Sequence, residues 1–546
     1  MVLKWFNNAQ ARFLPLFWGF CLFWTISPFP FPFGNQDPYL FWAINASLDG
    51  KLNADFLSNQ PDPFPLFTLL YRFLPVQFFA GLSHFLMFLI CVVYAKSASE
   101  LLKKQWKEYP VFILAILLVI HSSFLWGGFF KHLFFADYRW FTHHGIAKQG
   151  LLFGYFQPSA LGVFLLLGLV YYFQSKYREF LLCLLVAGAF HANYILLGLI
   201  LGCLAFLFRP RELWKEKKIM ILLILVWVSY LWYSINYFKV EGSAFNEAAV
   251  YFIQHNPHLD PLNWLNLETL IKLGFIWIAF YRRRHLFEGK FLLSLLGVTV
   301  FLSILTLVSK NSYLINLAPW RMSVIMMPMA IFFTIQVAIE KIKDRSWLKD
   351  FPFFGLILGA VVAELIYCFL GNPSSEYLIK WRWVAFFCLF LGALVNGIFS
   401  RFNDNKDLPA LLALLILPLA GMVQYGFEKR ECSLLPESSV EQELGQICGP
   451  NALVLFPLPM KSIRLRSLCP VYIDANVYFT PALPEWKRRL LWNKEFFQNP
   501  TRFSKEEIRK EGITHLVCSP EISLKEGSWM KKKKYKNLNV YQLNEP

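Results

Sequence analysis

The sequence predicts an α-helical polytopic membrane protein, GT-C-like in layout, with about 13 transmembrane segments and a small C-terminal α/β extracytoplasmic domain. Hydrophobic residues occupy 56% of the 546 positions and charged residues only 16%, whereas an average globular chain is about 25% charged. The charges lie between apolar stretches that are long enough to cross a bilayer. From residue 427 onward, short apolar runs alternate with polar segments.

The transmembrane domain is expected over residues 1–426. Its first apolar run, FLPLFWGFCLFWTISPFPFPF, has no small-residue cleavage site behind it and therefore predicts an uncleaved anchor. The Phe-Pro repeat ends this helix near Ser27, because each proline removes an amide donor. Further spans are expected near 73–95, 110–127, 156–174, 219–238, 267–281, 290–308, 320–340, 351–371, 378–399 and 408–425.

Positive charge orients the chain. Basic loops recur at 96–107, 175–178, 209–218, 281–285 and 340–349. Lys and Arg mark the cytoplasmic side of a membrane protein, so the N-terminus is expected to be cytoplasmic. The external loops are then 34–65, 128–149 and 239–266. Because the number of spans is odd, the domain over 427–546 is expected to be extracytoplasmic, and the net charge of +17 needs no nucleic acid to explain it.

The apolar run 180–208 has basic loops on both sides. A single span would move one of these loops outside, whereas two short helices turning at FHAN keep both inside. Such half-length helices are tolerated only where they are buried in protein or line a wet cavity. The sequence therefore favours a broken pair with His191 and Asn193 at the turn. One long tilted helix with a buried histidine is the alternative.

The C-terminal region reads as a small α/β domain. Strands are expected over 451–456, 470–474, 513–519 and 537–543, and helices over 484–497 and 504–512. Ser504 and Glu507 have the spacing of a capping box. Four cysteines lie in a compartment that permits disulfides, and their spacing leaves the pairing open, with Cys518 equally suited to be a packed thiol. These cysteines are Cys432, Cys448, Cys469 and Cys518.

Several stretches carry a resemblance to known proteins. The layout, with QDPYLF (36–41) in the first external loop, resembles GT-C membrane glycosyltransferases, which take sugars from polyprenyl-phosphate carriers. FHANYILLGL, QHNPHLDPLNW, APWRMSVIMM and NALVLFPLP…IRLRSLCPVYID…EWKRRLLW more closely resemble an uncharacterised bacterial multi-pass family, which brings no established activity. The Trp-Trp-Asp motif of oligosaccharyltransferases is absent, and this argues against transfer to protein asparagine.

Polar side chains gather on the predicted external loops. We expect Asp37 to be a general base or metal ligand and Asp137 to assist it, because both lie near membrane boundaries where a carboxylate is costly. Arg321 suits bidentate contact with a lipid phosphate; an interfacial arginine beside Trp320 is the alternative. The candidate substrate-binding residues are Arg139, His191, His255, His258, Asp260 and Arg321. For each histidine, a solvated loop position is the alternative.

The resemblance implies a glycosyltransferase that moves a sugar from a polyprenyl-phosphate carrier to an envelope acceptor on the extracytoplasmic side of a bacterial inner membrane. Two other classes compete with it: a non-catalytic envelope component that binds a partner through its C-terminal domain, and a transporter or flippase, which the deeply placed Glu364 favours. No cofactor is required, although a divalent cation would fit the acidic loops. The expected partners are membrane lipids and a polyprenyl-phosphate-linked sugar, without nucleic acid.

Overall fold

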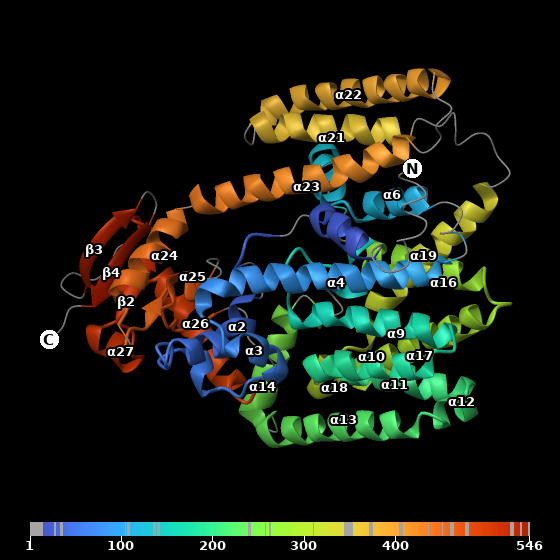
Figure 1. Ribbon diagram of the computed structural model, residues 1–546. Helices are drawn as coiled ribbons and strands as arrows, with labels where there is room; N and C mark the ends of the chain where they lie inside the picture. Colours follow the sequence, from blue (N-terminus) through green and yellow to red (C-terminus); the bar gives the residue numbers. More distant parts are fainter. Residues whose placement is uncertain are drawn as a thin grey trace.

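The structure, a computed structural model, is built mainly of helices, with a small sheet near the C-terminus (Figure 1). The residues that it describes are 15–26, 29–32, 36–103, 105, 110–134, 138, 142–238, 242–256, 258–260, 264–309, 311–342, 353–370, 375–402, 408–434, 436–449, 451–458, 463–474, 480–522, 524, 529–535 and 538–543.

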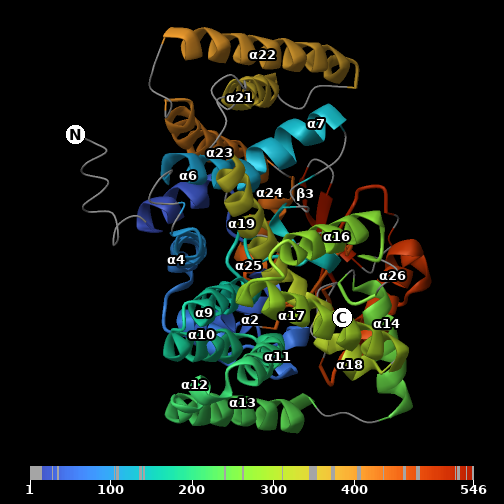
Figure 2. The ribbon, with the colours of Figure 1, turned by 90° about the vertical axis from the view of Figure 1, so that its right-hand side faces the viewer.

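The first part of the chain is helical. Figures 1 and 2 show α21 and α22 together at one end of the molecule, and α13 at the opposite end. The helices are α2 (Gln36–Ser47), α3 (Pro65–Arg72), α4 (Phe79–Leu101), α6 (Pro110–His121), α7 (Phe130–Phe134), α9 (Val163–Phe173), α10 (Tyr177–Phe190), α11 (Ala192–Phe208), α12 (Pro210–Trp214), α13 (Lys217–Phe238), α14 (Ser243–His255), α16 (Leu267–Tyr281), α17 (Phe287–Ser309), α18 (Ser312–Leu317), α19 (Ser323–Ile342), α21 (Phe353–Leu370), α22 (Ser375–Phe402) and α23 (Leu408–Leu434).

Four of the described helical segments are long and apolar enough, by length and composition, to cross a membrane. They are Val76–Leu101, Phe112–Phe134, Phe287–Ser309 and Pro319–Glu340. Each overlaps a span expected from the sequence. Shorter apolar helices at Pro15–Thr25, Pro158–Phe173, Ala192–Phe208, Gly355–Tyr367 and Trp381–Leu394 also coincide with expected apolar segments. The total of thirteen spans and the sides of the two termini stay predictions.

The broken helix pair in 180–208 is confirmed. Helix α10 ends at Phe190, α11 begins at Ala192, and the two helices pack against each other. His191 between them has an extended backbone, with φ −148° and ψ 117°, and its Nδ1 accepts a hydrogen bond from the Asn193 amide at 3.2 Å. The histidine therefore caps the second helix at the point where the chain reverses.

The C-terminal region holds a four-stranded sheet in the order β1-β2-β4-β3. Strand β1 pairs in parallel with β2, whereas β4 pairs antiparallel with both β2 and β3. The edge strand β3 was not expected, because its lysine run reads as a polar connection. The expected strand 470–474 makes only one bridge, between Val454 and Val471. The strands are β1 (Val454–Leu455), β2 (His515–Cys518), β3 (Trp529–Tyr535) and β4 (Leu538–Leu543).

Helices pack beside this sheet, in part as the sequence predicted. Helix α26 lies close to its expected range, and α27 begins with the expected capping box of Ser504 and Glu507. Helix α23 runs through the boundary expected at 426/427. The helices are α24 (Pro436–Ile447), α25 (Ile463–Ser467), α26 (Leu483–Gln498) and α27 (Lys505–Lys510).

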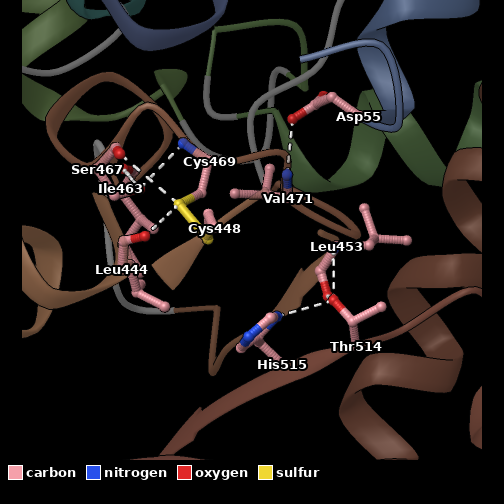
Figure 3. Close-up of a disulfide and its surroundings, with 10 residues drawn as sticks. All are labelled: Asp55, Leu444, Cys448, Leu453, Ile463, Ser467, Cys469, Val471, Thr514 and His515. Atoms are coloured by element: carbon pink, nitrogen blue, oxygen red, sulfur yellow. Dashed lines mark hydrogen bonds between the residues drawn. A yellow bond between two sulfur atoms is a disulfide. The ribbon is translucent and has the colours of Figure 1, made fainter. Parts of the chain in front are cut away.

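One disulfide joins Cys448 to Cys469, with the two Cα atoms 5.9 Å apart (Figure 3). It ties the end of α24 to the segment that follows α25. Cys518 is a buried free thiol in β2, which is one of the two readings that the sequence left open. Cys432 lies in α23, where the structure does not describe its side chain. The disulfide therefore anchors the segment 463–474, which contacts Asp37 and Asp55 through Arg464 and Val471.

Candidate functional site

Arg321 lies in a tight turn at the start of a candidate span. Ala318 adopts a left-handed conformation with φ 47°, and Pro319–Met322 then forms one 3-10 turn that leads into α19. Pro319 suits the first helical position, where its missing amide hydrogen has no partner to lose. Trp320 is fully buried and its indole N–H donates to the His258 carbonyl oxygen at 3.1 Å. These contacts hold the turn, and with it Arg321, against the external loop.

Among the described residues, the guanidinium of Arg321 has no hydrogen-bond or ion-pair partner. Its Nε is buried without a hydrogen bond, and within the part of the chain that the structure describes, no side chain forms an ion pair or hydrogen bond with it. Buried charges are ordinarily paired, because an uncompensated charge costs several kcal/mol, about 3–5 when a partner is removed. An unpaired, partly buried arginine is therefore the unusual feature of this region.

Helix α11, which begins directly after His191, packs against the turn that carries Arg321. The charge of Arg321 also acts on the side chains of Tyr39, His191 and Tyr194. Burial raises the pKa of Tyr39 to about 12, and the positive charge of Arg321 opposes this rise. The His191 ring packs between the rings of Phe64 and Tyr194, with centroids 5.3 and 4.8 Å away. The Tyr194 hydroxyl donates to the Ser159 carbonyl oxygen, so Arg321 is the charged donor near the helix break that suits an anion.

Two segments that the sequence predicts to be external loops, 128–149 and 239–266, contribute described residues beside this turn. The Ile146 amide donates to the Ser323 hydroxyl oxygen at 2.9 Å, and the His258 ring nitrogen Nδ1 lies 2.7 Å from the Ala147 carbonyl oxygen. The rings of Trp264 and Trp320 pack with their centroids 5.2 Å apart. Residues of 145–150, 258–260, 264–266 and 319–323 therefore form one layer of contacts next to Arg321.

Asp37 is bound to the C-terminal region. It is 3% exposed, in the first turn of α2, and Arg464 of α25 donates from Nη1 to its Oδ2 at 3.2 Å. The backbone amide of Leu465 donates to its Oδ1 at 3.0 Å. Both carboxylate oxygens are thus engaged, and the side chain does not face open solvent.

Arg464 also holds two further carboxylates. Its Nε and Nη2 donate to Asp55 at 2.8 and 3.2 Å in a bidentate pair, and its Nη1 lies 3.5 Å from Asp474. Asp55 additionally accepts the Val471 amide at 2.8 Å, close to the disulfide (Figure 3). We call Arg464, Asp37, Asp55 and Asp474 the carboxylate cluster. It joins α2 and the 48–60 segment to the C-terminal region.

The cluster shifts the pKa of two of its members, Asp37 and Arg464. Burial raises the pKa of Asp37 to about 7, while Arg464 opposes this rise and Asp474 and Asp55 add to it. For Arg464, burial lowers the pKa, but the negative charges of Asp55, Asp37 and Asp474 outweigh burial and raise it. One guanidinium is shared among three carboxylates, so Asp37 is only partly compensated.

The other expected site residues are distributed more widely. Asp137 and Arg139 lie outside the described residues. His255 is exposed and stacks on Tyr251 with centroids 4.0 Å apart, and Asp260 is partly buried. Among the described residues, no group of three or more His, Cys, Asp or Glu side chains could hold a metal ion. Glu364 has a partner that the sequence did not name, His132, whose Nδ1 lies 3.0 Å from its Oε2.

Sequence reasoning missed Arg464, Asp55, Asp474, Tyr39 and Tyr194. No local pattern distinguishes Arg464 from Arg466, the other basic residue of IRLRS. Tyr39 lies in QDPYLF and Tyr194 lies in FHANYILLGL. The sequence drew attention to these two stretches because of Asp37 and His191, and not because of the tyrosines. Long-range pairing between the ends of the chain was the missing information.

No protein-family model and no curated protein matches the chain. Among solved structures, it is similar to ArnT from Cupriavidus metallidurans bound to undecaprenyl phosphate, with 14% sequence identity and a TM-score of 0.44. The alignment covers 99% of this chain and 98% of that chain. A likeness of this degree assigns neither a fold nor a ligand to this protein.

Proposed function

We propose that the protein is a GT-C-type membrane glycosyltransferase that binds the phosphate of a polyprenyl-linked sugar at Arg321. The observation that carries the proposal is the partly buried guanidinium, without a partner among the described residues, at the start of a candidate span. A phosphate would supply the missing negative charge, and arginine binds phosphate oxygens in bidentate geometry. The apolar helices beside the turn suit the prenyl chain.

In this scheme the oxygen of an acceptor hydroxyl bonds to the anomeric carbon of the sugar, and the bond from that carbon to the phosphate oxygen breaks. Negative charge grows on the departing phosphate. Arg321 stabilises that charge, and the hydroxyl group of Tyr39 donates to a phosphate oxygen. The acceptor proton passes to a carboxylate, which acts as general base.

The identity of the base is a separate part of the proposal. Asp37 and Asp137 are the candidates from the sequence. Both carboxylate oxygens of Asp37 accept hydrogen bonds, one from Arg464 and one from the Leu465 amide. Asp37 could act as the base only if at least one of these hydrogen bonds broke. The contacts of Asp37 fit a structural link between α2 and α25 more directly, and Asp137 is then the stronger candidate.

The extracytoplasmic placement of the C-terminal region belongs to the same proposal. The Cys448–Cys469 disulfide supports it, because disulfides persist in oxidising compartments. Labelling of single cysteines introduced at 96–107 and after 427 tests the orientation. Labels that reach the C-terminal region only after the membrane is permeabilised would contradict it.

Binding of undecaprenyl phosphate to the purified protein in detergent tests the central claim. Replacing Arg321→Gln should weaken binding about 10- to 100-fold, since a hydrogen bond to a charged group is worth about 1.5–3 kcal/mol. Arg282→Gln changes an exposed arginine and is the matched control. Equal affinity in wild type and Arg321→Gln, or no binding by wild type, would refute the proposal.

Transport is the second candidate function. The pair of His132 and the buried Glu364 favours it, because ionisable pairs within membrane helices often mark ion or proton paths. Gly128, in the π-helical turn Phe124–Phe129, lies against the Glu364 carboxylate. Proton uptake by proteoliposomes that is lost in Glu364→Gln and kept in Arg321→Gln would select transport over transfer.

A further inference from the structure

The C-terminal region holds the first external segment through the carboxylate cluster. Arg464 is 1% exposed and contacts Asp37 and Asp55, which are also buried. The Leu465 and Val471 amides add two hydrogen bonds to the same carboxylates. A disulfide at Cys469 anchors the segment that supplies these donors. Helix α2 is therefore fixed to the C-terminal region by charge-assisted hydrogen bonds within a dry environment.

A second contact holds another external segment. Helix α26 packs along α14, where Lys487 pairs with Glu247 and Lys494 donates to the Tyr251 hydroxyl oxygen at 3.1 Å. The Trp486 ring packs on Tyr251 with centroids 6.0 Å apart. Helix α14 leads directly into the His258 loop, whose carbonyl oxygen accepts from Trp320 beside Arg321.

Helix α2 connects the carboxylate cluster with the Arg321 turn. Asp37 and Tyr39 stand two residues apart in α2. Residues at that spacing are about 200° apart around a helix and face opposite sides. One side of the first turn thus meets Arg464. On the other side, the Tyr39 ring packs on Phe64 with centroids 5.1 Å apart, and Phe64 packs on His191 at 5.3 Å. The helix that His191 caps, α11, packs against the Arg321 turn.

We propose that Arg464 is a positioning residue, which holds α2 so that the Tyr39 hydroxyl stays beside Arg321, and that the C-terminal region thereby sets the affinity of the Arg321 site for a lipid phosphate. This inference rests on the proposed function. Without Arg464, Asp37 and Asp55 would be buried carboxylates without a cation. Helix α2 would then move to hydrate them, and Tyr39 would move with it.

A double-mutant cycle tests the inference with the lipid phosphate used above. Tyr39→Phe and Arg464→Met should each weaken binding about tenfold, the equivalent of one charge-assisted hydrogen bond. If Arg464 acts through Tyr39, Arg464→Met should weaken binding less than about twofold further in the Tyr39→Phe background. Arg464→Lys keeps the charge and should recover part of the affinity.

Controls separate positioning from general damage to the fold. Arg502→Met removes an exposed ion pair with Glu495 in the same region and should leave binding unchanged. If Arg464→Met does not purify as a folded protein, Asp37→Asn replaces it in the cycle, because it keeps the shape of the side chain and weakens the same contact.

Two outcomes would overturn the inference: wild-type affinity in a folded Arg464→Met protein, or losses in Arg464→Met and Tyr39→Phe that multiply. Failure of the proposed function looks different. In that case wild type and Arg321→Gln would not differ in binding, whatever happens at Arg464.

Discussion

Two buried arginines of this protein differ in their surroundings. Arg464 is shared among three carboxylates, so its environment carries an excess of negative charge. Arg321 has tyrosines and a histidine around it and no carboxylate paired with it among the described residues. The guanidinium of Arg464 has all its charge paired with carboxylates, and these ion pairs join two parts of the chain. The second lacks a negative charge, and this is the property expected of a site that receives an anion.

The largest effect is expected from Arg464→Met. Removing the shared cation leaves buried carboxylates without compensation, which costs about 3–5 kcal/mol. The free energy of unfolding, followed by denaturant titration and by proteolysis of the C-terminal region, should fall by this amount. Arg502→Met provides the exposed comparison. A loss below about 1 kcal/mol, typical of a surface pair, would show that the cluster is not a tight link.

Removing the disulfide should have the next largest effect. Replacing Cys448 and Cys469 by serine should lower the free energy of unfolding by about 2–4 kcal/mol, because the unfolded loop gains freedom. The same variant should weaken the ion pairs of Arg464 with its carboxylates, because the disulfide at Cys469 anchors the segment that carries Arg464. Mass spectrometry of the non-reduced protein checks that the bond is present. A free thiol at either position would contradict the pairing.

Arg321→Met should have the opposite sign to Arg464→Met. Replacing an unpaired buried charge by an apolar side chain should raise the free energy of unfolding of the ligand-free protein by about 1–2 kcal/mol. Lipid-phosphate binding should be lost in the same variant. Destabilisation instead would indicate that Arg321 has a structural partner, and the contrast between the two arginines would disappear.

Asp37→Asn tests the excess charge of the cluster through pH. Burial raises the pKa of Asp37 in the folded state to about 7, above its ordinary value of about 3.9 in the unfolded chain. The folded protein then binds the proton more tightly, so the Asp37 contribution to stability falls as the pH rises from about 4 to about 7 and is constant above that range. The slope is at most about 1.4 kcal/mol per pH unit.

Thermal unfolding of wild type and Asp37→Asn across that pH range measures this slope. The variant should lose the dependence and keep its fold. If glycosyl transfer can be assayed, a loss of at least about a hundredfold in rate with an unchanged fold would support Asp37 as the base. Retained activity would support the structural link.

The smallest effect is expected from Lys487→Gln. Its pair with Glu247 lies at the surface, with the Glu247 side chain 74% exposed, and exposed pairs contribute about 0.2–1 kcal/mol. Stability and lipid-phosphate affinity should therefore change little, and the remaining packing of α26 on α14 should hold. If Lys487→Gln lowered the free energy of unfolding as much as Arg464→Met, the main link would be the contact between α14 and α26, and not the carboxylate cluster.

Local features of the structure could be predicted from the sequence. The break at His191 follows from charge on both sides of one apolar run, and the capping box at Ser504 follows from residue spacing. Four candidate spans lie where hydropathy predicts them. These features depend on residues that are close together in the chain, so a short stretch of sequence is enough to predict them.

Only the tertiary structure decided what the polar residues contact. Asp37 was expected to be a general base or metal ligand, yet it pairs with Arg464, which lies 427 positions away in the chain. Arg321 could be named as a phosphate ligand, but its lack of a partner is a property of the folded surroundings. Periodicity and composition encode which segments are helices or strands, whereas an ion pair depends on where two distant segments meet in space. That placement results from the packing of the whole chain, and no local pattern in this sequence records it.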